Sequence, residues 1–182
     1  MSRDIYNYLE DLGGTAKQRH AEALERIAEE WANELAGPEQ TRRIASVSLA
    51  EYERSLRQAV VEAFEAAAEH NTKAVYFEFD LDNDWASSFF LCTEYSPLSA
   101  GDDDWACEFH HALLGPDLAA FSEIYHENHF DRTEVAKGST LFLVARTVAS
   151  FVRAIEGVDI PPATAVCVAF HDQDPIMRIH ET

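Results

Sequence analysis

Val75-Tyr76-Phe77-Glu78-Phe79-Asp80-Leu81 is the stretch that decides the fold class. Its side chains alternate with a period of two, which is typical of a β-strand with one buried face. Asp82-Asn83 follows as a turn, and two further strands are expected over about 85–95 and 104–111. The sequence therefore predicts an antiparallel meander of three strands in the centre of the chain.

The residues before this meander have a helical period. Apolar side chains recur there every three or four positions, which predicts helices over about 1–12, 15–36 and 48–71. Ser48 and Glu51 have the spacing of a capping box at the start of the last one. We expect the two longer helices to pack together as an N-terminal hairpin.

After the meander, the sequence predicts two more helices and a C-terminal pair of strands. The helices are expected over about 116–128 and 139–156, and the strands over about 164–170 and 176–180. This order has no regular βαβ alternation, so a doubly wound sheet is not expected. We predict an α+β fold with a mainly antiparallel sheet of about five strands, packed with helices.

Composition indicates one domain and a cytoplasmic location. No internal linker is rich in Pro, Gly or Ser, so we expect a single domain over 1–182, helical over 1–71 and sheet-containing over 73–182. No apolar run is expected to approach the roughly 20 residues that a membrane span needs, and the start of the chain lacks a signal-peptide pattern. Without a glycine-rich phosphate loop or a GxSxG motif, no cofactor is expected.

Negative charge is the unusual property of the chain. It has 33 acidic and 14 basic residues, a net charge of −19. Between Lys73 and Arg132 there are thirteen acidic residues and no lysine or arginine. Such a field disfavours nucleic acid and anionic membranes as partners. It favours a basic protein partner, although an acidic composition can also serve solubility alone.

The predicted sheet separates these acids into two clusters at its opposite ends. One lies at the first hairpin turn and the other just before the third strand. The tryptophan beside each cluster would supply an aromatic anchor of the kind common at protein interfaces. The candidate partner-binding residues are Asp80, Asp82, Asp84, Trp85, Asp102, Asp103, Asp104 and Trp105.

The leading hypothesis is a non-enzymatic module that masks a basic protein. In charge and size the chain resembles the immunity proteins that neutralise bacterial nuclease toxins, without sharing a motif with them. This resemblance implies a small acidic inhibitor in the cytoplasm, and it leaves the oligomeric state open. A structural or oligomerisation role for the helices of residues 15–70 is a further possibility.

A metal-dependent enzyme is the alternative hypothesis. His126 and His129 are three positions apart, so they would share a helix face and bind a metal together with His110, His111 or a carboxylate. The spacing of a zinc-protease motif is i, i+4 and is absent. Histidines near a helix C-terminus are also favoured by the helix dipole alone.

Overall fold

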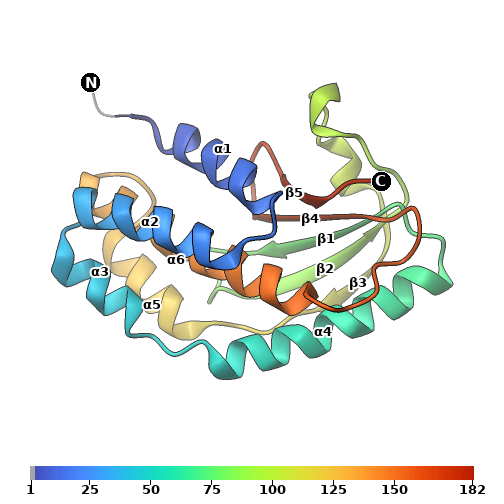
Figure 1. Ribbon diagram of the computed structural model, residues 1–182, viewed down its shortest axis with the longest axis horizontal. Helices are drawn as coiled ribbons and strands as arrows, with labels where there is room; N and C mark the ends of the chain where they lie inside the picture. Colours follow the sequence, from blue (N-terminus) through green and yellow to red (C-terminus); the bar gives the residue numbers. More distant parts are fainter. Residues whose placement is uncertain (1–2) are drawn as a thin grey trace.

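The computed structural model describes residues 3–182 and shows helices packed on one face of a mixed sheet (Figure 1). The helices are α1 (Ile5–Ala16), α2 (Ala21–Leu35), α3 (Pro38–Ala45), α4 (Ala50–Glu69), α5 (Ala119–Asn128) and α6 (Glu134–Ile155). The strands are β1 (Ala74–Phe79), β2 (Ser87–Cys92), β3 (Phe109–Leu114), β4 (Ala165–Phe170) and β5 (Met177–His180). The first predicted helix thus begins at Ile5, and positions 1 and 2 lie outside the described residues.

The strand order is β3-β2-β1-β4-β5, and this confirms the α+β class. β1, β2 and β3 form the expected antiparallel meander, and β4 and β5 form the expected C-terminal pair. The join between these two units is parallel, with Phe77 of β1 opposite Val168 of β4. The carboxyl ends of β1 and β4 therefore meet at the same edge of the sheet.

Helix α6 is the centre of the helical layer. It starts at Glu134, five residues before the predicted Ser139, because the Thr133 hydroxyl accepts a hydrogen bond from the Ala136 N–H at 3.0 Å. Phe151 stacks on Phe77 of the sheet with ring centroids 4.8 Å apart. The helix is long and apolar enough to cross a membrane, but 89% of its most apolar window is buried inside the protein, as in the core of a soluble protein.

The two long N-terminal helices do not pack on each other as the predicted hairpin requires. Both α2 and α4 pack mainly against α6, which lies between them and is buried along almost its whole length. Helix α3 was not predicted and begins at Pro38, a residue suited to a first helical turn. Ser48 does not cap α4, whose first residue is Ala50.

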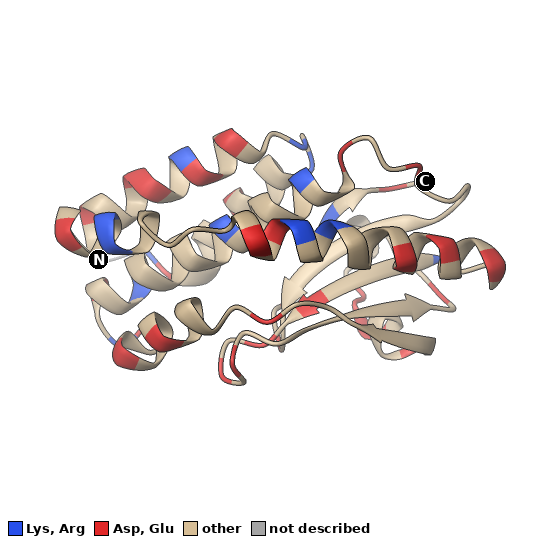
Figure 2. Ribbon diagram, turned by 90° about the horizontal axis from the view of Figure 1, so that it is seen from below, with Lys and Arg blue, Asp and Glu red and all other residues tan. Residues whose placement is uncertain are grey.

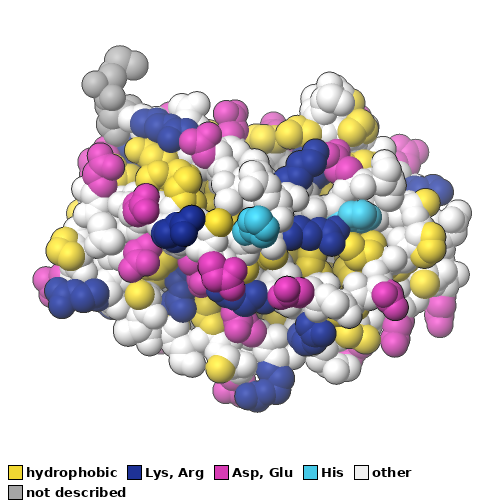
Figure 3. Space-filling view, in the orientation of Figure 1, with side chains coloured by type: hydrophobic (Ala, Val, Ile, Leu, Met, Phe, Trp, Pro, Cys, Tyr) yellow, Lys and Arg dark blue, Asp and Glu magenta, His cyan; other side chains and the backbone are white. Residues whose placement is uncertain are grey.

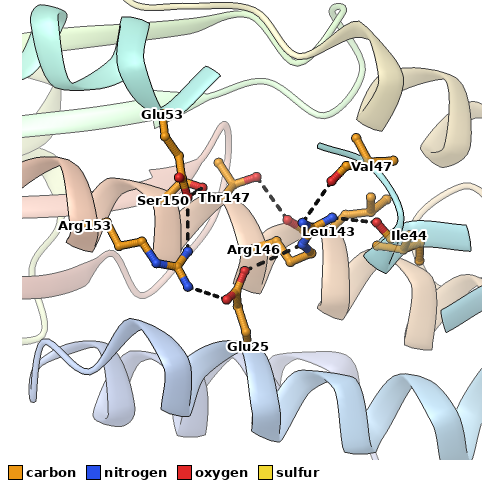
Figure 4. Close-up of polar contacts among 9 residues, drawn as sticks. All are labelled: Glu25, Ile44, Val47, Glu53, Leu143, Arg146, Thr147, Ser150 and Arg153. Carbon is orange, nitrogen blue, oxygen red and sulfur yellow. Dashed lines mark hydrogen bonds and ion pairs between the residues drawn. The ribbon is translucent and has the colours of Figure 1, made fainter. Parts of the chain in front are cut away.

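A network of two glutamates and two arginines holds these helices together (Figure 4). Glu25 of α2 pairs with Arg153 and lies 3.6 Å from Nε of Arg146, while Glu53 of α4 is 3.1 Å from Arg153. Arg146 also donates hydrogen bonds to two backbone carbonyls, that of Ile44 in the last turn of α3 and that of Val47 in the α3–α4 connection. Burial lowers the pKa of Arg146, and the nearby carboxylates oppose this shift.

Candidate functional site

The face of the sheet opposite the helices carries a second, smaller apolar cluster. Tyr76, Cys92 and Cys167 belong to it, together with Trp105 from the segment 93–108, which we call the flap. The flap contains two short 3-10 helices, η1 (Leu98–Ala100) and η2 (Asp104–Cys107), and η2 folds over β2. Beside it the β4–β5 loop, residues 171–176, rises from the other half of the sheet.

Between the flap and the β4–β5 loop lies a concavity of about 450 Å³. Its floor includes Tyr76 and Phe90 of the sheet, and its edge includes Phe109, which is 46% exposed and has its ring centroid 4.7 Å from that of Phe90. Five carboxylates line it, those of Glu78, Asp103, Asp104, Asp172 and Asp174. Among the described residues, no lysine or arginine lines it.

Glu78 organises the floor of the concavity. Its carboxylate accepts a hydrogen bond from the Tyr76 hydroxyl at 2.9 Å and lies 3.2 Å from Nδ1 of His171. The hydrogen bond to Glu78 raises the pKa of His171 above its usual 6.5. Burial, reinforced by the negative charge of Glu78, raises the pKa of Tyr76, so its hydroxyl keeps its proton and remains a donor.

Asp103 links the flap to β5. Its carboxylate binds the guanidinium of Arg178 and accepts the Ile176 N–H at 2.9 Å. Burial alone would raise the pKa of Asp103, but these two partners outweigh burial and hold it below 3.8. Arg178 in turn lies over the ring of Trp105, 5.7 Å from its centroid. The flap is therefore fixed to the sheet by an ion pair and an aromatic contact.

The predicted acidic residues do not form one cluster at each end of the sheet. Asp80, Asp82 and Asp84 lie in the β1–β2 turn as expected, with Asp80 accepting the Asp82 N–H at 3.0 Å. Asp103 and Asp104, however, lie over the open face. The expected position was wrong because β3 begins at Phe109 instead of Asp104, and the residues between them form η2.

Asp102 is exposed beside this group and accepts the Asp104 N–H at 3.0 Å. It does not line the concavity.

The role of the two tryptophans as surface anchors is contradicted. Trp85 is 0% exposed, and its Nε1 donates to the Thr147 hydroxyl at 2.9 Å, while its ring packs against Phe79 and Phe121. Trp105 of the flap is 4% exposed, and its ring packs against those of Tyr76 and Tyr95. Both side chains fill apolar clusters and present no surface to a partner. Phe109 is the exposed aromatic residue at the concavity.

The histidines of the alternative hypothesis are not brought together. His126 and His129 are on and just after α5, whereas the His110 ring lies 5.3 Å from that of His70 at the end of α4. Helix α5 and the end of α4 lie at opposite sides of the molecule (Figure 1). Within residues 3–182 no three His, Cys, Asp or Glu side chains are arranged to hold a metal ion.

His111 is on β3 next to His110 and is exposed. It does not join His126 and His129, which the fold places with α5 against α6.

Charge is distributed differently on the two sides of the protein. Figure 2 shows lysine and arginine mainly on the helices, while the loops that join the strands carry acidic residues. On the helix-covered face in Figure 3, basic and acidic side chains are interspersed. Of the thirteen acids between Lys73 and Arg132, only Asp103 and Glu127 have an arginine ion pair among the described residues, with Arg178 and Arg43. Most of that acidic stretch therefore stays uncompensated.

Three of the five carboxylates of the concavity were not among the predicted site residues: Glu78, Asp172 and Asp174. Asp172 and Asp174 follow β4, and Glu78 is near the end of β1. Their proximity depends on the parallel pairing of these two strands. The sequence shows acidic residues after both predicted strands, 75–81 and 164–170, but it does not indicate that these two strands pair in parallel.

We found no match for this chain among protein-family models, curated proteins or solved structures. The site must be interpreted from its geometry and charge.

Proposed function

We propose that this chain is a non-enzymatic protein-binding module that docks a basic protein on the open face of its sheet. In this proposal it is a single cytoplasmic domain that acts as an immunity-type inhibitor by masking the partner's cationic surface. The observation that carries the proposal is the concavity beside the flap. It brings five carboxylates together, and no lysine or arginine of the described chain lines it.

Electrostatics gives a reason for a partner. Carboxylates held close together repel one another, and this repulsion costs folding stability. A cationic protein surface would offset that cost on binding and would also accelerate association by steering. The same field repels phosphate backbones and anionic lipids, so nucleic acid and membranes are not the proposed partners.

Geometry adds to the electrostatic argument. A concave surface with a fixed rim is preorganised, because the Asp103–Arg178 pair already holds the flap in place. The exposed ring of Phe109 provides apolar contact at the edge of the acidic surface. An apolar contact surrounded by charged groups is the usual composition of an energetically important interface region.

The proposal is tested by capture of a basic partner from extracts of the native cell at low salt, with two neutralised variants. In the first, Asp104, Asp172 and Asp174 are changed to Asn; all three are exposed. In the matched control, the exposed helical residues Glu22, Glu30 and Glu34 are changed to Gln, which gives the same net charge.

The expected result is a basic protein that the unmodified chain and the helical variant retain, that the concavity variant loses, and that elutes with added salt. Equal loss from both variants would show that net charge, and not this surface, is responsible. Absence of any basic partner at low salt would contradict the proposed function.

A further inference from the structure

A second pocket adjoins the concavity and is apolar. It has a volume of about 110 Å³ and lies where the end of α1 meets η1 and the start of β5. Its apolar lining includes Leu9, Leu98, Ile176 and Met177. Leu98 is 52% exposed, so an apolar side chain of the flap is presented to solvent at the pocket's border.

Three of the four charged residues that line this pocket are held in ion pairs, and the fourth, Glu10, is exposed to solvent. Lys17 forms an ion pair with Glu181, which also accepts the Tyr95 hydroxyl at 2.8 Å, and Arg178 is bound by Asp103. These pairs leave no strong demand for an ionic ligand at the pocket wall. The space is therefore suited to an aliphatic group, which gains by leaving water.

The pocket and the acidic concavity are neighbours on the protein. Ile176 lines both of them, and the Asp103–Arg178 pair lies between them. A partner that covers the carboxylates of Asp172 and Asp174 would pass over Ile176 to reach the apolar pocket. Hydrophobic pockets next to charged rims are common sites of anchor residues.

We propose that this pocket receives an aliphatic side chain of the basic partner, from a segment whose lysines or arginines bind the neighbouring carboxylates. The inference rests on the proposed function and adds the chemistry of the partner's binding segment. The partner is thus expected to present a leucine-like residue flanked by cationic residues, and not cationic residues alone.

Substitutions at Gly14 test whether the pocket binds an aliphatic side chain. Gly14 lines the pocket within α1, and a Cβ atom added there would meet no other atom within 4 Å. Gly14→Leu therefore fills the space from a helical position, while Gly14→Ala is the control that leaves most of the pocket empty. Both changes favour the helix, so both proteins are expected to fold at least as stably as the original.

The probes are two short lysine peptides that differ only at one central residue, leucine or alanine. Their binding to the unmodified protein, Gly14→Ala and Gly14→Leu is measured by fluorescence anisotropy at low salt. The leucine peptide is expected to bind about tenfold more tightly than the alanine peptide to the first two proteins, because it buries more apolar surface. For Gly14→Leu the two peptides are expected to bind equally.

The other possible results separate failure of this inference from failure of the proposed function. A leucine preference that survives in Gly14→Leu, or equal binding of both peptides to the unmodified protein, overturns the inference and leaves the proposed function standing. Failure of both peptides to bind at low salt contradicts the proposed function itself. If N-acetyl-leucine amide, which carries no cation, competes as well as the leucine peptide, the pocket is a small-ligand site and the inference is wrong.

Discussion

Arg178 of β5 is bound by Asp103 of the flap, a residue 75 positions earlier in the chain. The arginine is almost fully buried, with 3% of its surface exposed, and it also donates hydrogen bonds to the carbonyls of Ile176 and Ser96. This single side chain connects the flap, β5 and the β4–β5 loop. The shape of the acidic concavity therefore depends on it.

We predict that Asp103→Asn lowers the free energy of unfolding by about 3 kcal/mol, because it leaves a buried guanidinium without its counter-charge. Asp102→Asn is the control. Asp102 is exposed, and asparagine can still accept the Asp104 N–H, so its effect should stay within about 0.5 kcal/mol. Urea unfolding monitored by circular dichroism measures both. Equal effects of the two substitutions would show that the ion pair does not hold the flap.

The same ion pair predicts a dependence of stability on acid. The pKa of Asp103 is lower in the folded protein than its usual 3.8. The contribution of the pair is therefore present above pH 3.8 and is lost as the pH falls through the folded-state pKa. Unfolding measured between neutral pH and pH 3 should show a smaller acid-dependent loss in Asp103→Asn than in the unmodified protein. Identical dependence of stability on pH in the two proteins would contradict a lowered pKa of Asp103 in the folded state.

His171 gives the concavity a response near neutral pH. Its pKa is raised above 6.5 by Glu78, so its stabilising contact is present below pH 6.5 and is lost as the pH rises through the folded-state pKa. Protonated His171 also adds positive charge to the acidic surface. Binding of an oligolysine peptide should therefore strengthen as the pH rises through the pKa of His171.

Titration of the His171 ring protons by NMR measures this pKa directly. Glu78→Gln should lower it, whereas Glu94→Gln, at an exposed acid of the flap, should leave it unchanged. A pKa that responds equally to both substitutions would mean that general charge, and not the contact with Glu78, is the cause.

The fold class could be predicted from residues 75–81 and the apolar period of the helices because these patterns are local. The concavity could not, because it depends on contacts between distant segments. Nothing in the sequence identified Arg178 and Asp103 as partners, because they are 75 positions apart. The sequence also gave no sign that β1 and β4 pair in parallel, and this pairing places Glu78 beside the β4–β5 loop.

Trp85 shows why proximity in sequence to an acid does not make an aromatic residue a surface anchor. We predict that Trp85→Phe lowers the free energy of unfolding by about 2 kcal/mol, since it removes a buried hydrogen bond and reduces packing. Asp84→Asn should be nearly neutral, because asparagine tolerates the positive φ of 53° at this position. Neither should change oligolysine affinity; a loss on Trp85→Phe would restore an interface role.

The network around Glu25 is predicted to be structural. Glu25→Gln removes the carboxylate that pairs with both Arg146 and Arg153 and leaves Glu53 as the acidic partner in this network. This change should lower the free energy of unfolding by about 2 kcal/mol. Glu29→Gln, one turn further along α2 at an exposed position, should cost less than about 0.5 kcal/mol. Thermal unfolding of the two variants measures the difference. Equal melting temperatures would show that the network contributes little.

In the proposed function, the acidic surface on the open face of the sheet binds lysine and arginine side chains of a partner protein. Mapping the NMR amide shifts caused by an oligolysine peptide at low salt tests it most directly. The shifts are expected to concentrate at Glu78, Asp104, Asp172 and Asp174 and to disappear with added salt. Shifts spread evenly over the exposed acids of α2 and α4 would contradict it.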